Sequence, residues 1–304
     1  MNKHDCLIIG AGPCGIGAAL KLKEAGVDFL IIDGSTPGGK VNIAPRVDNY
    51  PGFKEIPGPD LAFKLIERLM NNGISIAGDN ILSLTKEDGL FKAEGQFDTY
   101  YAKTVLIATG TKERKVGLSK EDELLGHGVS YCALCDGHFF KGLDVAVVGG
   151  GNAALKEAIH LAHITRKLYV IHRRNEFRGS NNLVNELKEM DNVEIITPYI
   201  PVEILGEDKV TGLVIENKED ASRRTLEVQG LFPLVGQIPN TSFIKIDGVL
   251  NEWGTIPVER NMMTSCSGLF AGGDVLPRDI RQIYLAEHDG MVASKSIIDY
   301  LKNE

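Results

Sequence analysis

A glycine-rich turn that occurs twice limits the folds open to this chain more than any other feature. The first copy, at residues 10–15, follows an apolar run at 6–9 and precedes a helical pattern at 16–24. Glycines there permit a tight turn and let the backbone approach a pyrophosphate, which then lies at the helix N-terminus. This order predicts a Rossmann-like nucleotide-binding unit. The predicted contacts are Gly10, Gly12, Pro13 and Gly15.

The next apolar run supports that interpretation. Residues 29–32 predict a second strand, and Asp33 stands at its end. An acidic residue in this place hydrogen-bonds a ribose hydroxyl in Rossmann-type sites. We therefore expect Asp33 to contact the same nucleotide. A plain glycine turn without a ligand is the competing interpretation of the first motif taken alone.

The second copy of the turn lies at residues 149–154 and has the form GxGxxA. It follows an apolar run at 145–148 and precedes a helical pattern at 155–163. The same reasoning predicts a second nucleotide-binding unit. The predicted contacts are Gly149, Gly151, Asn152, Ala153 and Ala154.

Basic residues follow the strand predicted after the second turn. The apolar run at 167–171 ends where a site for NAD would place Asp or Glu. Guanidinium groups in that place suit a 2′-phosphate, which favours NADPH over NADH. A solvated basic turn is the alternative. The residues concerned are His172, Arg173, Arg174 and Arg178.

Two cysteines with redox spacing, Cys132 and Cys135, lie between the two glycine turns. A Cys-x-x-Cys pair interconverts between disulfide and dithiol in a two-electron step. A hydride donor and a flavin commonly supply those electrons, and each needs a cradle for its pyrophosphate. A structural zinc site is the competing interpretation, but it needs two further ligands, and the sequence has no second Cys-x-x-Cys. We interpret the other cysteines as packing residues: Cys6, Cys14 and Cys266.

Taken together, these motifs resemble those of the bacterial-type, low-molecular-weight thioredoxin reductases, over nearly the whole chain. The most specific element is Cys-Ala-Leu-Cys-Asp-Gly at 132–137, placed between the two glycine turns. The resemblance implies FAD and NADPH as cofactors, thioredoxin as the partner and a homodimer as the assembly. The other matching segments are 10–15, 108–110, 172–178, 273–275 and 281–282.

The resemblance also implies roles for individual residues. Cys135 would lie next to the flavin, Cys132 would exchange with the disulfide of thioredoxin, and Asp136 would act as general acid or base. An acidic turn residue before a glycine is the alternative for Asp136. The implied FAD contacts beyond the first turn are Gly38, Gly39, Lys40, Asn49, Ala108, Thr109, Gly110, Gly273, Asp274, Arg281, Gln282 and Ile283.

Four departures from the family pattern affect the expected cofactor contacts. Ala153 stands where the family usually has Ser, and Lys156 where it often has Glu. Lys40 replaces the usual Gln after two glycines, and Ala-Glu-His at 286–288 replaces Ala-Ala-Gly. A polar contact to the nicotinamide nucleotide is therefore expected to be missing.

Motif order and resemblance agree on an α/β chain of two nested Rossmann-like domains. Residues 1–113 begin a discontinuous FAD domain, 114–240 form an inserted NADPH domain that carries the cysteine pair, and 241–304 complete the FAD domain. The family's cysteine pair cannot face flavin and thioredoxin at once, so the resemblance implies rotation of the inserted domain about two short hinges.

Charge and hydropathy exclude other classes. The formal net charge is −8, from 33 basic and 41 acidic residues, which argues against nucleic acid as a partner. No apolar run approaches the roughly 20 residues of a membrane span, and no signal-peptide pattern precedes the first strand. We expect a cytoplasmic protein. The remaining alternatives are a flavin dithiol oxidase, a reductase that serves a peroxidase, and a nucleotide-binding redox sensor without turnover.

Overall fold

The computed structural model describes residues 2–44 and 46–303 and divides the chain into two compact units. One unit, which we call the discontinuous unit, comprises residues 1–112 and 238–304. The other, the inserted unit, comprises residues 113–237. Both are α/β structures with parallel sheets, as the sequence predicts. The chain passes between them along β7 (Thr111–Glu113) and β15 (Gln237–Pro239), which pair with each other.

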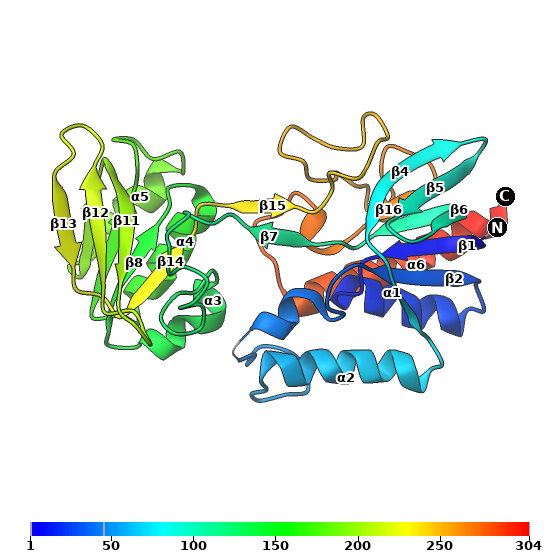
Figure 1. The fold of residues 1–304 in the computed structure, drawn as a ribbon, viewed down its shortest axis with the longest axis horizontal. Coiled ribbons are helices and arrows are strands. Elements are labelled where there is room, and N and C mark those ends of the chain that lie inside the picture. Colours follow the sequence, from blue (N-terminus) through cyan, green and yellow to red (C-terminus); the bar gives the residue numbers. More distant parts are fainter. Residues whose placement is uncertain (1, 45, 304) are drawn as a thin grey trace. The chain divides into compact units, whose positions relative to one another are not determined.

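The discontinuous unit is built on a mixed sheet with the strand order β3-β2-β1-β6-β5-β4, to which β16 adds beside β6 (Figure 1). The strands β3, β2, β1, β6 and β16 are parallel, whereas β4 and β5 form an antiparallel hairpin. The strands are β1 (Asn2–Ile9), β2 (Phe29–Asp33), β3 (Ile76–Gly78), β4 (Ile81–Glu87), β5 (Leu90–Gly95), β6 (Thr99–Ile107) and β16 (Leu269–Ala271).

Both faces of this sheet are covered, which explains the unbroken apolar run in β1. Cys6 and Ile8 pack into one core with three helices, while Leu7 and Ile9 pack into the core on the other face. A parallel strand buried on both faces has no polar alternation. The helices are α1 (Pro13–Glu24), α2 (Gly58–Asn71) and α6 (Ile283–Asn303); the 3₁₀ turns are η1 (Gly39–Ile43) and η3 (Gly273–Val275).

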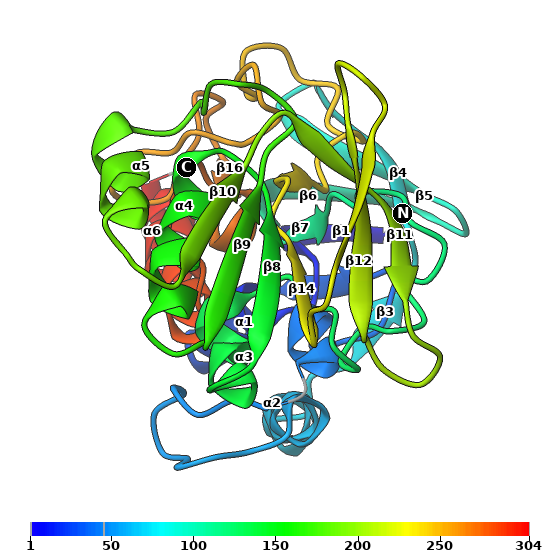
Figure 2. The same ribbon diagram turned by 90° about the vertical axis from the view of Figure 1, so that its left-hand side faces the viewer.

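Figure 2 faces the inserted unit, where four parallel strands run in the order β10-β9-β8-β14. A second, antiparallel sheet has the order β11-β12-β13. The strands are β8 (Asp144–Val148), β9 (Lys167–Ile171), β10 (Val193–Ile196), β11 (Tyr199–Leu205), β12 (Gly212–Asn217), β13 (Arg223–Leu226) and β14 (Gly230–Pro233). The helical segments are α3 (Ala133–Asp136), η2 (Gly137–Phe140), α4 (Asn152–Ala162) and α5 (Asn181–Lys188).

The two helices that follow the glycine turns begin three residues earlier than their apolar patterns indicate. Helix α1 begins at Pro13 rather than Ile16, because proline is suited to the first helical position. Helix α4 begins at Asn152 rather than Leu155, directly after its N-cap Gly151. The last helix, α6, begins at Ile283. No helix in the described ranges has the length and hydropathy needed to cross a membrane.

Candidate active site

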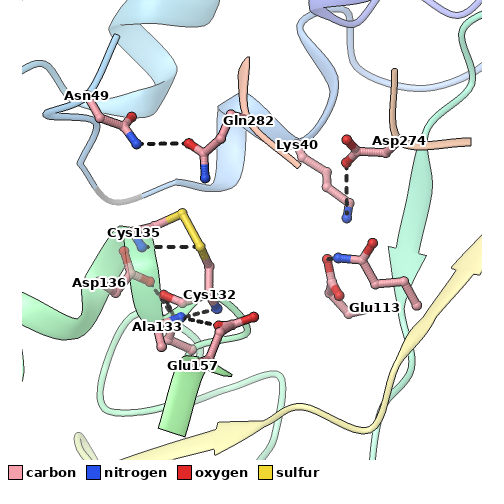
Figure 3. The surroundings of a disulfide bond; sticks show 12 residues. Lys40, Asn49, Glu113, Cys132, Ala133, Cys135, Asp136, Glu157, Asp274 and Gln282 are labelled. Carbon is pink, nitrogen blue, oxygen red and sulfur yellow. Dashed lines mark hydrogen bonds and ion pairs between the residues drawn. A yellow bond between two sulfur atoms is a disulfide. The ribbon is translucent and has the colours of Figure 1, made fainter. Parts of the chain in front are cut away.

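The two redox-spaced cysteines form a disulfide at the start of α3 (Figure 3). Their Cα atoms are 5.3 Å apart. Cys132 is the N-cap of α3, and its sulfur accepts a hydrogen bond from the backbone N–H of Cys135 at 3.2 Å. A sulfur at a helix N-terminus is stabilised as thiolate by the free N–H groups there. The site therefore places the disulfide where backbone N–H groups can assist thiol–disulfide exchange.

Asp136 lies directly after Cys135 and is only 8% exposed. The Ser130 hydroxyl donates to Asp136 Oδ2 at 2.6 Å, and the same hydroxyl oxygen accepts from the N–H of Cys132 at 3.1 Å. Burial raises the pKa of the Asp136 carboxyl, against the hydrogen bond from Ser130 and the charge of His138. A carboxyl that keeps its proton to higher pH suits a proton donor beside two sulfurs.

The other oxygen of Asp136 supports this interpretation. Asp136 Oδ1 is buried and has no hydrogen-bond partner among the described residues. A buried unpaired acceptor is costly for a structural residue. It suits a group that exchanges a proton with a neighbouring sulfur.

Glu157 also belongs to this site, although none of the sequence motifs indicates it. It lies on α4, and its Oε2 accepts the backbone N–H of Ala133, between the two cysteines, at 2.7 Å. Burial raises the pKa of Glu157 to about 7. The only sequence signal is an acidic residue close to the second glycine turn, and nothing in the spacing connects it to residue 133.

The first glycine turn fits a dinucleotide. A side chain at Gly10, where φ is +108°, would overlap the carbonyl oxygen of Ala108, and one at Gly15 would overlap that of Gly10. In contrast, a Cβ at Gly12 would meet nothing within 4 Å, so the outer side of the turn is open. The N–H groups at the start of α1 lie behind this open side, where a pyrophosphate is favoured.

Asp33 lies at the end of β2, as predicted, and its carboxylate is bonded to the backbone. Oδ2 accepts the N–H of Ala11 at 2.6 Å, and Oδ1 accepts that of Ser35 at 2.8 Å. Each carboxylate oxygen has two lone pairs, so both retain capacity for a ribose hydroxyl. Asp33 is thus held beside the turn before any ligand binds.

Other segments implied by the resemblance come together around the first turn. The N–H of Gly38 donates to Ala11 O at 2.7 Å, the N–H of Ala108 donates to Ile9 O at 2.8 Å, and the N–H of Gly272 donates to Ile107 O at 3.1 Å. These bonds gather residues 38–40, 108–110 and 272–274 at the carboxyl ends of the parallel strands. Ligands of open α/β sheets bind at this edge.

Side chains in these segments bond to one another (Figure 3). Lys40 Nζ donates to Thr111 Oγ1 at 2.8 Å and lies 3.8 Å from Asp274 Oδ2. Asn49 Nδ2 donates to Gln282 Oε1 at 2.8 Å. The remaining contacts of the predicted residues are Thr109 Oγ1 to Asn240 O at 2.7 Å and Arg281 Nε to Asp274 O at 3.5 Å.

The second glycine turn is also a close-packed βα turn. A Cβ at Gly149 would lie 2.5 Å from Leu234 O, and Ala154 is 3% exposed in the core. Asn152 Oδ1 accepts the N–H of Ser180 at 2.7 Å, so this side chain fixes the segment before α5. Ala153 is exposed at the start of α4.

His172 differs from the three arginines near it in burial, and its ring lies against the second turn, where a Cβ at Gly150 would be 2.3 Å from it. His172 is 9% exposed, its ring stacks on Phe177 with centroids 4.9 Å apart, and burial lowers its pKa. Arg173, Arg174 and Arg178 are exposed, and none of these guanidinium groups forms a hydrogen bond or ion pair with another described residue.

Arg178 is the arginine that the structure places at the second turn. A Cβ at Gly151 would lie 3.2 Å from Arg178 Nη2. The guanidinium therefore lies over the glycine turn, and such a group suits the phosphates of a nucleotide.

Comparison with known proteins agrees with this geometry. Residues 4–290 match the pyridine nucleotide-disulphide oxidoreductases. The chain belongs to that family. It is 39% identical over 300 residues to a thioredoxin reductase of Mycoplasma pneumoniae, and this match covers 98% of this chain and 95% of the relative.

Solved structures give the same class. The thioredoxin reductase of Streptococcus pyogenes superposes with a TM-score of 0.92 at 36% identity, covering 100% of this chain and 99% of that one. A ferredoxin-flavin thioredoxin reductase of Clostridium acetobutylicum superposes with a TM-score of 0.55 at 31% identity, covering 99% of each chain. The protein is thus similar to thioredoxin reductases along its whole length.

Proposed function

We propose that this protein is a thioredoxin reductase that uses FAD and NADPH. The observation that carries the proposal is the Cys132–Cys135 disulfide, held at a helix N-terminus beside a buried carboxyl in a chain with two dinucleotide-binding turns. The comparisons support the same activity.

The discontinuous unit would hold FAD and the inserted unit NADPH. The first turn, Asp33 and the gathered segments 38–40, 108–110 and 273–274 would contact FAD, together with Asn49 and residues 281–283. The second turn would hold the NADPH pyrophosphate, and Arg173, Arg174 and Arg178 its 2′-phosphate. When bound, FAD supplies the two-electron chemistry that connects a nicotinamide hydride to a disulfide.

The chain's own residues carry out the exchange with thioredoxin. After the pair is reduced, the Cys132 thiolate attacks the disulfide of thioredoxin, which forms a mixed disulfide and releases one thioredoxin sulfur as thiolate. Cys135 then attacks Cys132 Sγ, restores the Cys132–Cys135 disulfide and releases the second sulfur. Asp136 would supply a proton to a departing thiolate, because its raised pKa keeps it protonated above the usual range of Asp.

A ferredoxin-driven enzyme is the second candidate, because one structural neighbour is described as a ferredoxin-flavin thioredoxin reductase. Arg173, Arg174 and Arg178 favour NADPH instead, because they are exposed and bond to no other described residue. Steady-state oxidation of NADPH with and without thioredoxin decides between them. We expect thioredoxin-dependent consumption of NADPH. Thioredoxin reduction that proceeds with reduced ferredoxin but not with NADPH would overturn the proposed donor.

The proposal includes a cytoplasmic homodimer that has neither a nucleic acid nor a membrane as its partner. The resemblance of the motifs implies the homodimer, and no helix among the described residues is long and apolar enough to cross a membrane. Analytical ultracentrifugation of the FAD-loaded protein should give twice the mass of one chain. A monomer at all concentrations would contradict the dimer without affecting the proposed reaction.

A further inference from the structure

The redox helix α3 is too short to hold its own geometry. It spans four residues, and its i→i−4 bond runs from Asp136 N to Cys132 O at 3.0 Å. Helices of this length are unstable without outside partners. The positions of both sulfurs therefore depend on what the rest of the inserted unit provides.

Helix α4 provides that support at both ends of α3. At the first end, Glu157 Oε2 accepts the N–H of Ala133, a residue that is fully buried. At the other end, a Cβ at Gly137 would lie 3.1 Å from Leu161 Cδ2, so the backbone packs directly on α4. Of these two contacts, the one with Glu157 is polar, and the carboxyl group that makes it can carry a charge.

Two groups that can become anions share one end of α3. The carboxylate of Glu157 takes the N–H of Ala133, and the sulfur of Cys132 takes the N–H of Cys135 (Figure 3). While the disulfide is closed, only the carboxylate can carry charge. Reduction adds a second potential anion to the same helix end, and two like charges so placed disfavour each other.

We propose that Glu157 is a positioning residue for the redox pair. Its carboxyl group holds the redox helix by the first N–H of that helix, and its negative charge opposes formation of the Cys132 thiolate. The inference deepens the proposed function and rests on it only in taking Cys132 and Cys135 as a redox pair. In the described part of the chain Glu157 forms no hydrogen bond with either sulfur; it acts through the backbone of Ala133.

This arrangement couples reduction to the protonation of Glu157. Reduction of the disulfide by dithiothreitol breaks the S–S bond, gives two electrons to the sulfurs and leaves the reagent as its cyclic disulfide. The two thiols of the reagent release two protons, of which one goes to Cys135 and the second is shared between Cys132 and Glu157. The pair then titrates as a coupled system. Burial, which raises the pKa of Glu157 to about 7, places this sharing near neutral pH.

Other charged groups lie on β7, on or directly after α3, and on α4. Glu113 on β7 raises the pKa of Glu157 further. Asp136 and His138 lie on or directly after α3, and Lys156 and His160 lie on α4 itself. The elements β8 and β9 and helix α5 contribute apolar residues to the core around α4, including Val147, Val170 and Leu187. Glu157 is the acid in direct hydrogen-bond contact with the backbone between the cysteines.

The test measures the rate of Cys132 alkylation by iodoacetamide as a function of pH in the FAD-loaded protein after reduction with dithiothreitol and its removal. Mass spectrometry of the peptide separates Cys132 from the other cysteines. Glu157→Gln keeps an oxygen acceptor for the Ala133 N–H but removes the charge. We expect its alkylation midpoint to be lower than that of wild type by about one pH unit. Glu186→Gln, at an exposed glutamate on α5, is the matched control and should not shift the midpoint.

Several outcomes would overturn the inference. An unchanged midpoint in a folded Glu157→Gln protein means that Glu157 only stabilises the fold. If that variant does not fold, the wild-type protein alone still tests the coupling. Coupled titration requires that the rate of Cys132 alkylation change with pH over a broader range than the titration of one group. A profile that fits one pKa contradicts the coupling. Neither NADPH nor thioredoxin enters the experiment, so failure of the proposed function would appear separately, as a pair that dithiothreitol reduces but NADPH does not.

Discussion

The two glycine turns follow one sequence pattern but differ in how tightly their surroundings constrain them. In the first, a methyl group at the third glycine, Gly15, would overlap the carbonyl oxygen of Gly10. In the second, the same position is Ala154, which fits into the core because a glycine faces it: a Cβ at Gly149 would lie 2.7 Å from the Ala154 methyl group. Both turns thus exclude a side chain at the first glycine, and only the first turn also excludes a methyl group at the third position.

The polar residues near the two turns also differ in how firmly they are held. Asp33 is fixed by two backbone N–H groups, whereas Arg173, Arg174 and Arg178 are exposed and bond to no described residue. A preorganised site loses little entropy when its ligand binds, while mobile side chains must be ordered at that moment. The first turn is therefore suited to a cofactor that stays bound, and the second to one that exchanges in every cycle.

The largest effect is expected from a methyl group added to the first turn. Gly15→Ala forces the backbone of the turn to move, because the overlap is with a carbonyl oxygen rather than a flexible side chain. We expect the purified variant to lose its bound FAD and with it all reductase activity, which the visible spectrum measures. The matched change in the second turn is Ala154→Gly, which should cost about 1 kcal/mol of stability and leave NADPH use intact. Flavin retained at the wild-type level in Gly15→Ala would show that the first turn is not the constrained one.

The next largest effect concerns the arginines of the second turn. Charge-assisted hydrogen bonds contribute about 1.5–3 kcal/mol each. Arg173→Ala combined with Arg174→Ala should therefore lower kcat/KM for NADPH by about two to four powers of ten while changing the value for NADH little. An equal loss for both coenzymes would mean that the pair supports the unit rather than the 2′-phosphate. A wild type that prefers NADH would assign the preference to Ala153 and Lys156.

A smaller effect is expected between the turns, at Asp136. Asp136→Asn should slow thioredoxin reduction by about 100-fold, without weakening either nucleotide. Burial raises the pKa of Asp136, and a proton donor is lost as the pH rises through its pKa. The wild-type rate should therefore fall across that range, and the Asn variant should be flat. Activity within about a factor of two of wild type would reduce Asp136 to a turn residue.

Most of the fold could be predicted from local sequence patterns. The features that could not be predicted depend on contacts between residues far apart in the sequence. Both turns, the strands that precede them and Asp33 were predictable, because each depends on residues within one βα unit. The contacts of Glu157 with Ala133 and of Asn49 with Gln282 were not, since they join residues 24 and 233 positions apart. The spacing also grouped His172 with the arginines, but it could not show that the His172 ring is buried and stacked on Phe177.

The central claim is that electrons from NADPH reach the Cys132–Cys135 pair, and it can be tested in the protein without its partner. FAD-loaded protein is mixed with NADPH under anaerobic conditions, alkylated and digested, and the alkylation of Cys132 and Cys135 is measured by mass spectrometry. Both cysteines should be alkylated after NADPH is added and neither in the untreated protein. A disulfide that remains closed after NADPH has been oxidised would contradict the claim.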